Sequence, residues 1–124
     1  MKLKDLIGYQ LVSINSEEIV VRKDDKEYTL YIIDDGGGCC GYNDITTELL
    51  IDNAEVKRNP IITNVEIDEY EQDDGSKAKL TFFGEYKPIA VVDTYSSSGS
   101  GWCYGACVTI ECEILGINDT LSAW

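Results

Sequence analysis

The chain has 124 residues, 44% of them hydrophobic, and its 23 acidic against 10 basic residues give a formal net charge of −13. This length predicts a single domain, residues 1–124, and the composition is that of a globular protein rather than a disordered chain. The excess of acids repels nucleic-acid phosphates and anionic lipids, which argues against both as direct ligands and leaves a protein as the expected partner. The same charge also serves solubility alone.

No stretch reaches the roughly 18 consecutive apolar residues of a membrane span, and the first residues lack the apolar core of a signal peptide. We therefore expect a soluble protein of the cytoplasm that does not engage a membrane. Five cysteines cannot all pair within one chain, so we expect reduced thiols. No pattern in the sequence specifies an oligomeric state.

The first third of the chain predicts a helical turn and three strands. Residues 3–8 are typical of a helical turn ended by a glycine, and strand-forming residues follow over 9–14. Residues 19–23 and 28–33 flank a short polar break and predict a hairpin. Both faces of 28–33 are largely apolar, so we expect this strand to be central in its sheet, or covered on both sides, rather than at an edge.

The middle of the chain predicts a further hairpin. Residues 45–51 favour a strand, although a helix capped by Asn43 or Asp44 is the alternative. A polar link over 53–59, with room for one helical turn, leads to a long strand over 61–72. A turn at 73–76 then returns the chain into 77–83, and we expect Gly75 to supply the positive φ of this turn.

The last third predicts two strands. Residues 89–95 form one, and 108–115 alternate so that Val108, Ile110, Cys112 and Ile114 share a core face. The tail, 116–124, carries no clear period, although Trp124 is too apolar to be left in solvent. Seven or eight short strands with one or two helical turns predict a mainly β protein: an antiparallel sheet, a sandwich or a half-open barrel.

Two glycine-rich loops, 34–44 and 96–107, each follow a strand and combine glycine with cysteine and tyrosine. If their parent strands run in the same direction, the loops meet at one end of the sheet, with aspartates such as Asp34, Asp35, Asp44 and Asp93 around them. We predict a binding surface there, formed by Cys39, Cys40, Tyr42, Asp44, Tyr95, Trp102, Cys103 and Tyr104.

The cysteines of these loops suggest a metal site only weakly. Zinc prefers four nitrogen or sulfur ligands, and the candidates are Cys39, Cys40, Cys103 and Cys107. Adjacent cysteines chelate one ion poorly, so buried reduced thiols are the stronger interpretation, with a disulfide or redox pair between the loops as another. The chain has no histidine, which removes Ser-His and Cys-His nucleophiles. We expect no catalytic residues and no cofactor.

Four segments together resemble a known group of sequences: LIG, DGGGCCGY, TFFG and AVVDTYSSSG, at residues 6–8, 35–42, 81–84 and 90–99. Their succession resembles a family of small uncharacterised bacteriophage and prophage domains with a glycine-rich Cys-Cys loop. The chain departs from that family's pattern at Gly41-Tyr42, where an acidic residue is usual, and in its serine-rich loop before Trp102. The resemblance implies a β-rich fold and expression in a phage-bearing host cell.

Two functions follow as hypotheses. The first is a non-enzymatic binding module that uses the aromatic side chains of the loops, although the same rings can instead close the sheet end. The second is an acidic decoy that inhibits a nucleic-acid-binding host protein, suggested by a cluster of six acids between residues 66 and 74, namely Glu66, Asp68, Glu69, Glu71, Asp73 and Asp74. A solvated hairpin explains those acids without any function.

Overall fold

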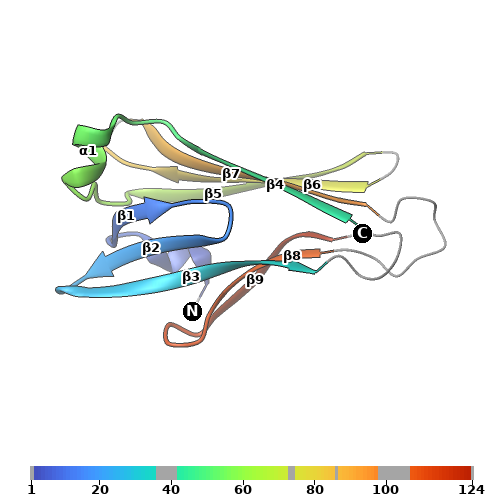
Figure 1. The fold of residues 1–124 in the computed structure, drawn as a ribbon, viewed down its shortest axis with the longest axis horizontal. Coiled ribbons are helices and arrows are strands. Elements are labelled where there is room, and N and C mark those ends of the chain that lie inside the picture. Colours follow the sequence, from blue (N-terminus) through green and yellow to red (C-terminus); the bar gives the residue numbers. More distant parts are fainter. Residues whose placement is uncertain (1, 36–41, 73–74, 86, 98–106, 124) are drawn as a thin grey trace.

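The computed structural model describes residues 2–35, 42–72, 75–85, 87–97 and 107–123. Within these residues, nine strands form two antiparallel sheets that face each other across a common core (Figure 1). The mainly β, antiparallel fold expected from the sequence is therefore confirmed, and the sandwich is the form it takes.

Each sheet is an antiparallel ladder with one central region and two edges. Sheet A has the order β1 (Gln10–Ile14), β2 (Glu18–Lys23), β3 (Lys26–Asp35), β8 (Cys107–Cys112) and β9 (Ile117–Ala123). Sheet B has the order β4 (Tyr42–Leu49), β7 (Pro88–Ser97), β6 (Gly75–Phe83) and β5 (Asn64–Gln72). Residues 45–49 are thus a strand, as expected, and the undecided tail supplies the ninth strand, β9.

The hairpin between β2 and β3 follows from its two turn residues. Lys23 pairs with Lys26, and Asp24 and Asp25 between them have φ of +53° and +63°. Two successive residues with positive φ match the twist of a two-residue hairpin, and aspartate tolerates that conformation better than most residues. The strand that follows lies in the middle of sheet A, so its predicted central position is confirmed.

The C-terminal end of β8 differs from the expected alternation. The strand ends at Cys112, and a turn over residues 113–116 leads into β9. Gly116 closes that turn with a φ of +67° and donates its N–H to the Glu113 carbonyl at 3.1 Å. The prediction that Ile114 belongs to the core face was therefore wrong, because the chain reverses before that position and leaves Ile114 82% exposed.

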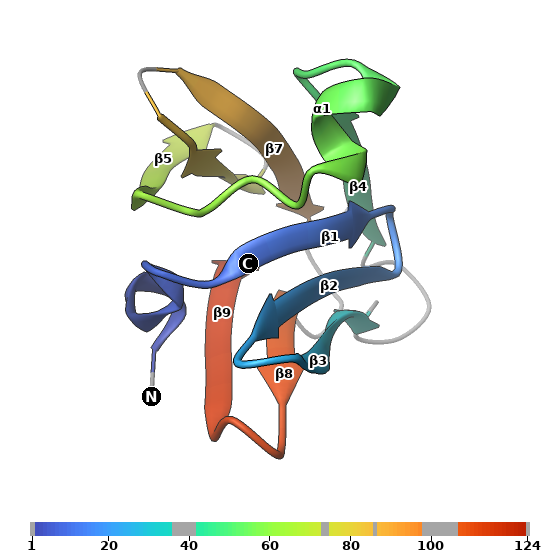
Figure 2. The ribbon, with the colours of Figure 1, turned by 90° about the vertical axis from the view of Figure 1, so that its left-hand side faces the viewer.

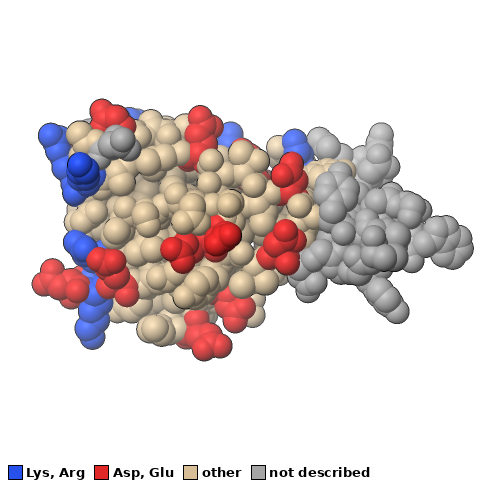
Figure 3. Space-filling view, viewed as in Figure 1, with Lys and Arg blue, Asp and Glu red and all other residues tan. Residues whose placement is uncertain are grey.

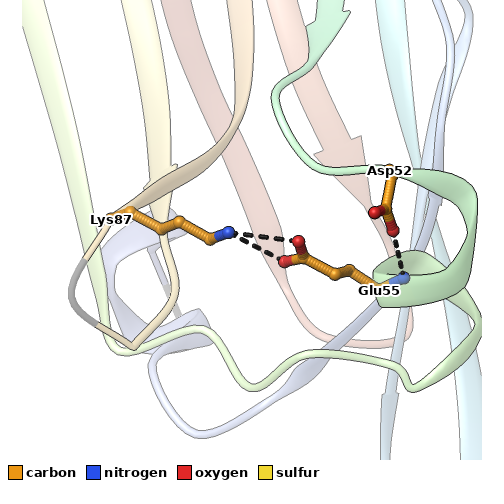
Figure 4. Close-up of polar contacts among 3 residues, drawn as sticks. All are labelled: Asp52, Glu55 and Lys87. Atoms are coloured by element: carbon orange, nitrogen blue, oxygen red, sulfur yellow. Dashed lines mark hydrogen bonds and ion pairs between the residues drawn. The ribbon is translucent and has the colours of Figure 1, made fainter.

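The described residues also contain two short helices: η1 (Leu3–Leu6), which precedes β1, and α1 (Asn53–Lys57), which lies between β4 and β5. Asp52 caps α1, since its Oδ1 accepts a hydrogen bond from the Glu55 N–H at 2.8 Å (Figure 4). Glu55 Oε2 also lies 2.9 Å from Lys87 Nζ in the β6–β7 connection, an exposed ion pair that contributes less than about 1 kcal/mol. Neither helix, nor any other in the described part of the chain, is long and apolar enough to cross a membrane.

The segment after α1 joins the two sheets through backbone hydrogen bonds to β1 and the residues before it. Ile62 donates its N–H to the Tyr9 carbonyl at 2.7 Å, and Leu11 donates to the Pro60 carbonyl at 2.8 Å. Figure 2 shows this segment running beside β1. The strand expected from residue 61 therefore begins only at Asn64, because residues 60–62 pair with the edge of sheet A instead.

The inward faces of both sheets form one cluster of buried side chains. Phe82 of β6 is the largest fully buried residue, and Leu3 and Leu6 of η1 close the cluster where the sheets separate. Cys112 belongs to it and is 3% exposed, which confirms the burial expected for this residue.

Native protein treated with a thiol reagent is expected to carry label at Cys107 and not at Cys112. Both thiols are free, but Cys107 is half-buried at the start of β8 whereas Cys112 lies inside the core. Reagents attack the accessible thiolate, so burial protects Cys112 until the protein unfolds. Peptide mass spectrometry after digestion measures each site, and denaturant should make the two label equally. Rapid labelling of Cys112 in the native protein would contradict its burial.

Candidate functional site

The strand ends that flank the two glycine-rich loops lie at one end of the sandwich. Asp35 at the end of β3 pairs with Cys107 at the start of β8, and Tyr42 of β4 pairs with Ser97 of β7. Figure 1 shows these four strand ends together, and we call this region the loop end. The parent strands β3 and β7 therefore run toward the same end, which is the condition on which the predicted meeting of the two loops depends.

A polar network, exposed at Asp34 and buried at the serines, joins the two sheets at the loop end. Asn43 Nδ2 donates to Asp34 Oδ1 at 2.7 Å and to the Cys107 carbonyl at 2.9 Å. Ser96 Oγ donates to Asn43 Oδ1 at 2.6 Å, and since it has one proton, it accepts from Ser122 Oγ at 2.7 Å. Ser96 and Ser122 are fully buried, so this network fixes how the loop-bearing strands of the two sheets sit relative to each other.

Most of the predicted binding surface falls outside the described residues. Cys39, Cys40, Trp102, Cys103 and Tyr104 are all in the undescribed segments, and only the backbone of Tyr42 is placed. Asp44 is exposed on β4 and pairs with Tyr95. Contact between the two loops therefore stays a prediction.

Tyr95 has a packing role in sheet B. A Cβ atom built on Gly75 would lie 2.9 Å from Tyr95 Cζ, so the half-buried ring covers this glycine. An aromatic ring over a strand glycine replaces the side-chain packing that the glycine lacks. Asp93, two residues earlier, pairs with Thr46 and Lys79 in the middle of the sheet and does not border the loop end as expected.

The basic side chains gather at the opposite end of the molecule. Figure 3 shows most of the visible lysine and arginine side chains at the end away from the undescribed loops, with a few more along the upper edge, while acidic side chains are spread over the whole visible face, that end included. This end contains the β2–β3 hairpin, α1 and the β6–β7 connection. Their basic residues, namely Arg22, Lys23, Lys26, Lys57, Arg58 and Lys87, are matched in number by acids of the same segments, namely Asp24, Asp25, Glu27, Asp52, Glu55 and Glu85. Lys23 Nζ lies 4.8 Å from the centre of the Tyr9 ring there, and burial raises the pKa of the Tyr9 phenol.

The acidic run suggested as a decoy is divided between the two faces of edge strand β5. Val65 is buried toward the core, so Glu66 and Asp68 point outward on alternate positions. Glu69 lies on the same side as Ile67, and both line a pocket with Asp119. The acids that the structure describes here do not form one continuous surface.

The outer face of sheet A carries an apolar surface that the sequence did not single out. Tyr31 and Ile33 of β3 are 53% and 41% exposed, and the 82% exposed Ile114 follows β8. We call these three residues the apolar strip. They line a pocket of about 480 Å³ on this face, together with Glu27, Glu111 and Glu113. The sequence did contain a signal for this surface, namely that both faces of 28–33 are largely apolar. That feature was explained instead by a central or doubly covered position of the strand.

Acidic side chains border the apolar strip on both sides. Tyr31 pairs with Glu18 of β2 on one side and with Glu111 of β8 on the other. Directly paired residues of antiparallel strands point to the same face about 5 Å apart, so two carboxylates flank the exposed ring. Arg22 on the same face is already engaged by Glu27 in an ion pair.

The structure places Cys107 alone of the four metal candidates, as a half-buried free thiol at the start of β8. In the described part of the chain, no three side chains of the metal-binding types gather into a group. The fold is that of an acidic antiparallel β-sandwich. No protein-family model, curated protein or solved structure matches the chain, so functional inference rests on the geometry of the two surfaces above.

Proposed function

We propose that the chain is a non-enzymatic protein-binding module of a phage or prophage that acts in the cytoplasm of the host cell. Its binding surface is the apolar strip on sheet A, extended toward the loop end. Ile33 is two residues before Asp35, where β3 reaches that end, so the strip lies on the strand that leads to the loop end. Regular strands hold the strip rigidly, which suits a preformed binding surface.

The observation that carries this proposal is the exposure of the strip. An antiparallel sheet with one face in water normally alternates apolar residues inward with polar residues outward. The inward residues Leu30 and Ile32 follow that rule, whereas Tyr31 and Ile33 break it in the middle of the sheet. Exposed apolar groups beside a pocket are typical of interaction sites, and tyrosine is enriched among residues that dominate binding energy.

The alternatives have less support. A decoy of nucleic acid needs its charges on one surface, and the described acids of β5 lie on both faces of that strand. A metal or redox role for the cysteine loops depends on residues outside the described ranges. The phage setting is supported by the sequence resemblance alone.

Site-directed photo-crosslinking in a bacterial host lysate tests the proposal. A crosslinking amino acid at Ile114 is expected to form a discrete protein adduct, because this position belongs to the strip and is open to solvent. Combining it with Tyr31→Asp and Ile33→Asp should abolish the adduct, since charged groups on the strip make its desolvation unfavourable. Gel electrophoresis and mass spectrometry measure the adduct.

The matched control places the same amino acid at Tyr70, which is 47% exposed on the outer face of sheet B. No strip-dependent adduct is expected from that position. Identical adducts from both positions, or an Ile114 adduct that persists in the Asp variants, would contradict binding through the strip. Thermal unfolding of each variant verifies that the fold is intact, because exposed substitutions usually change stability by only about 0.5 kcal/mol.

A further inference from the structure

We infer that the apolar strip recognises a basic protein segment in which a lysine or arginine stands next to an apolar side chain. This inference rests on the proposed function and adds the chemistry of the partner. The cation is received by the ring of Tyr31 and its two neighbouring glutamates, and the apolar side chain enters the pocket beside Ile33 and Ile114.

The row Glu18, Tyr31 and Glu111 crosses three adjacent strands and fits a long cationic side chain. The aliphatic stem of lysine or arginine packs on the exposed ring while its charge stays near the carboxylates and water. A cation over a tyrosine ring is itself attracted by the ring's quadrupole. The three side chains therefore contribute attraction of the same sign to one ligand group.

The charge of the pocket selects against other occupants. Its described lining includes Glu27, Glu111 and Glu113 and no lysine or arginine, and the nearby Arg22 is paired with Glu27. An acidic segment would meet like charges, whose repulsion at an interface disfavours binding. If the strip of a second copy docked here, the glutamates of one copy would face the same glutamates of the other. Each copy also carries a net charge of −13, so the two would repel each other.

The pocket supplies the apolar half of the recognition. The pocket has a volume of about 480 Å³, and Ile33, Ile114 and Tyr31 supply part of its lining, so it has room for an aliphatic or aromatic side chain. Charge alone would attract any basic polymer at low salt. The pocket adds the requirement for an apolar neighbour, which separates a specific partner from a merely cationic one.

Binding of defined synthetic peptides to the full chain tests this inference. The probe is a fluorescent peptide in which lysine alternates with leucine, compared with one carrying glutamate for lysine and one carrying serine for leucine. The lysine-leucine peptide is expected to bind, and both relatives to bind at least about tenfold more weakly. Fluorescence anisotropy at low and high salt gives each Kd, and the affinity should fall with salt while a residual apolar part remains.

Variants locate the binding. Tyr31→Ser is expected to weaken the lysine-leucine peptide by about tenfold, and Glu18→Gln with Glu111→Gln by about fivefold. The matched controls keep the same chemistry on sheet B. Tyr70→Ser removes an exposed tyrosine that pairs with Lys77, and Glu66→Gln with Asp68→Asn removes the same charge far from the strip. These controls should bind as the parent chain does.

Equal losses in the strip and control variants would overturn the inference, because binding would then follow overall charge. Equal binding of the lysine and glutamate peptides would overturn it as well. If the host adduct at Ile114 depends on the strip but survives Glu18→Gln with Glu111→Gln and high salt, the module binds a partner of other chemistry, and only this inference fails. If no strip-dependent adduct forms, the proposed function itself fails.

Concentration-dependent sedimentation that is lost with Tyr31→Asp would instead identify a second copy as the occupant and contradict a basic partner.

Discussion

Replacing Gly75 by alanine is expected to destabilise the protein by about 3 kcal/mol, because the strand pairing leaves no room for a side chain. A Cβ atom at this position would collide with the Ser96 carbonyl oxygen of the adjacent strand and lie 2.9 Å from the Tyr95 ring. The carbonyl is part of the backbone and cannot turn away. The sequence predicted a glycine with positive φ here, but Gly75 is the first residue of β6 and has no such φ.

Gly116 is the matched control, because this position needs glycine for its backbone conformation and not for lack of space. It has a φ of +67°, and an added Cβ would meet no heavy atom within 4 Å. Gly116→Ala should cost about 1 kcal/mol, and Gly116→Asn less, because asparagine adopts this conformation readily. Gly75→Asn should be at least as harmful as Gly75→Ala. Urea unfolding measures the free energy of unfolding of all four variants. If Gly75→Asn were clearly more stable than Gly75→Ala, the prediction that Gly75 is needed for a positive φ would be favoured again.

Asn43→Ala is expected to lower the free energy of unfolding by about 2 kcal/mol, because it removes the centre of the network that joins the sheets. The Cys107 carbonyl loses its Asn43 donor, and the buried Ser96 hydroxyl loses its acceptor. The loop end should also open locally, which faster amide hydrogen exchange in β4 and β8 would reveal.

A double-mutant cycle separates the serine pair from the rest of the network. Ser96→Ala and Ser122→Ala should each destabilise the protein, because each leaves the other buried hydroxyl without this partner. The double variant removes both hydroxyls, so it should destabilise the protein by less than the sum of the single variants. The control is the Thr109 and Thr120 pair, whose oxygens are 3.4 Å apart on the exposed face. Its removal should change stability by less than about 0.5 kcal/mol. Strict additivity for the serines would show that their contact carries no energy.

Much of this fold could be predicted because the sequence patterns that set its strands and turns each span only a few neighbouring residues. Alternation over 108–112 and the short polar break around residues 24–25 each act within a few residues, and each appears in the structure, as a strand and as a hairpin. Ile114 was misplaced because the alternation continues in sequence for two positions after the strand has ended. The positive φ of Gly116, which ends it, has no signature in the apolar period.

The candidate site was harder to predict because it depends on partners far apart in the chain. Asn43 and Cys107 are 64 residues apart, and Ser96 and Asn43 are 53 apart, so no short window contains the network. The apolar strip could not be predicted for a related reason. A strand with two apolar faces can be packed against other elements on both faces or on one face only. The assembled sheets show that the outer face of β3 is exposed.

The separation of charge along the molecule bears on how quickly a partner is found. Because bases balance acids at the end away from the loops and acids exceed bases over the rest, the negative charge is unevenly distributed, which gives the chain an electric dipole in addition to its net charge. A positively charged partner is attracted to the whole molecule, and most strongly to the part where acids exceed bases. The association rate, more than the lifetime of the complex, will therefore carry the dependence on salt.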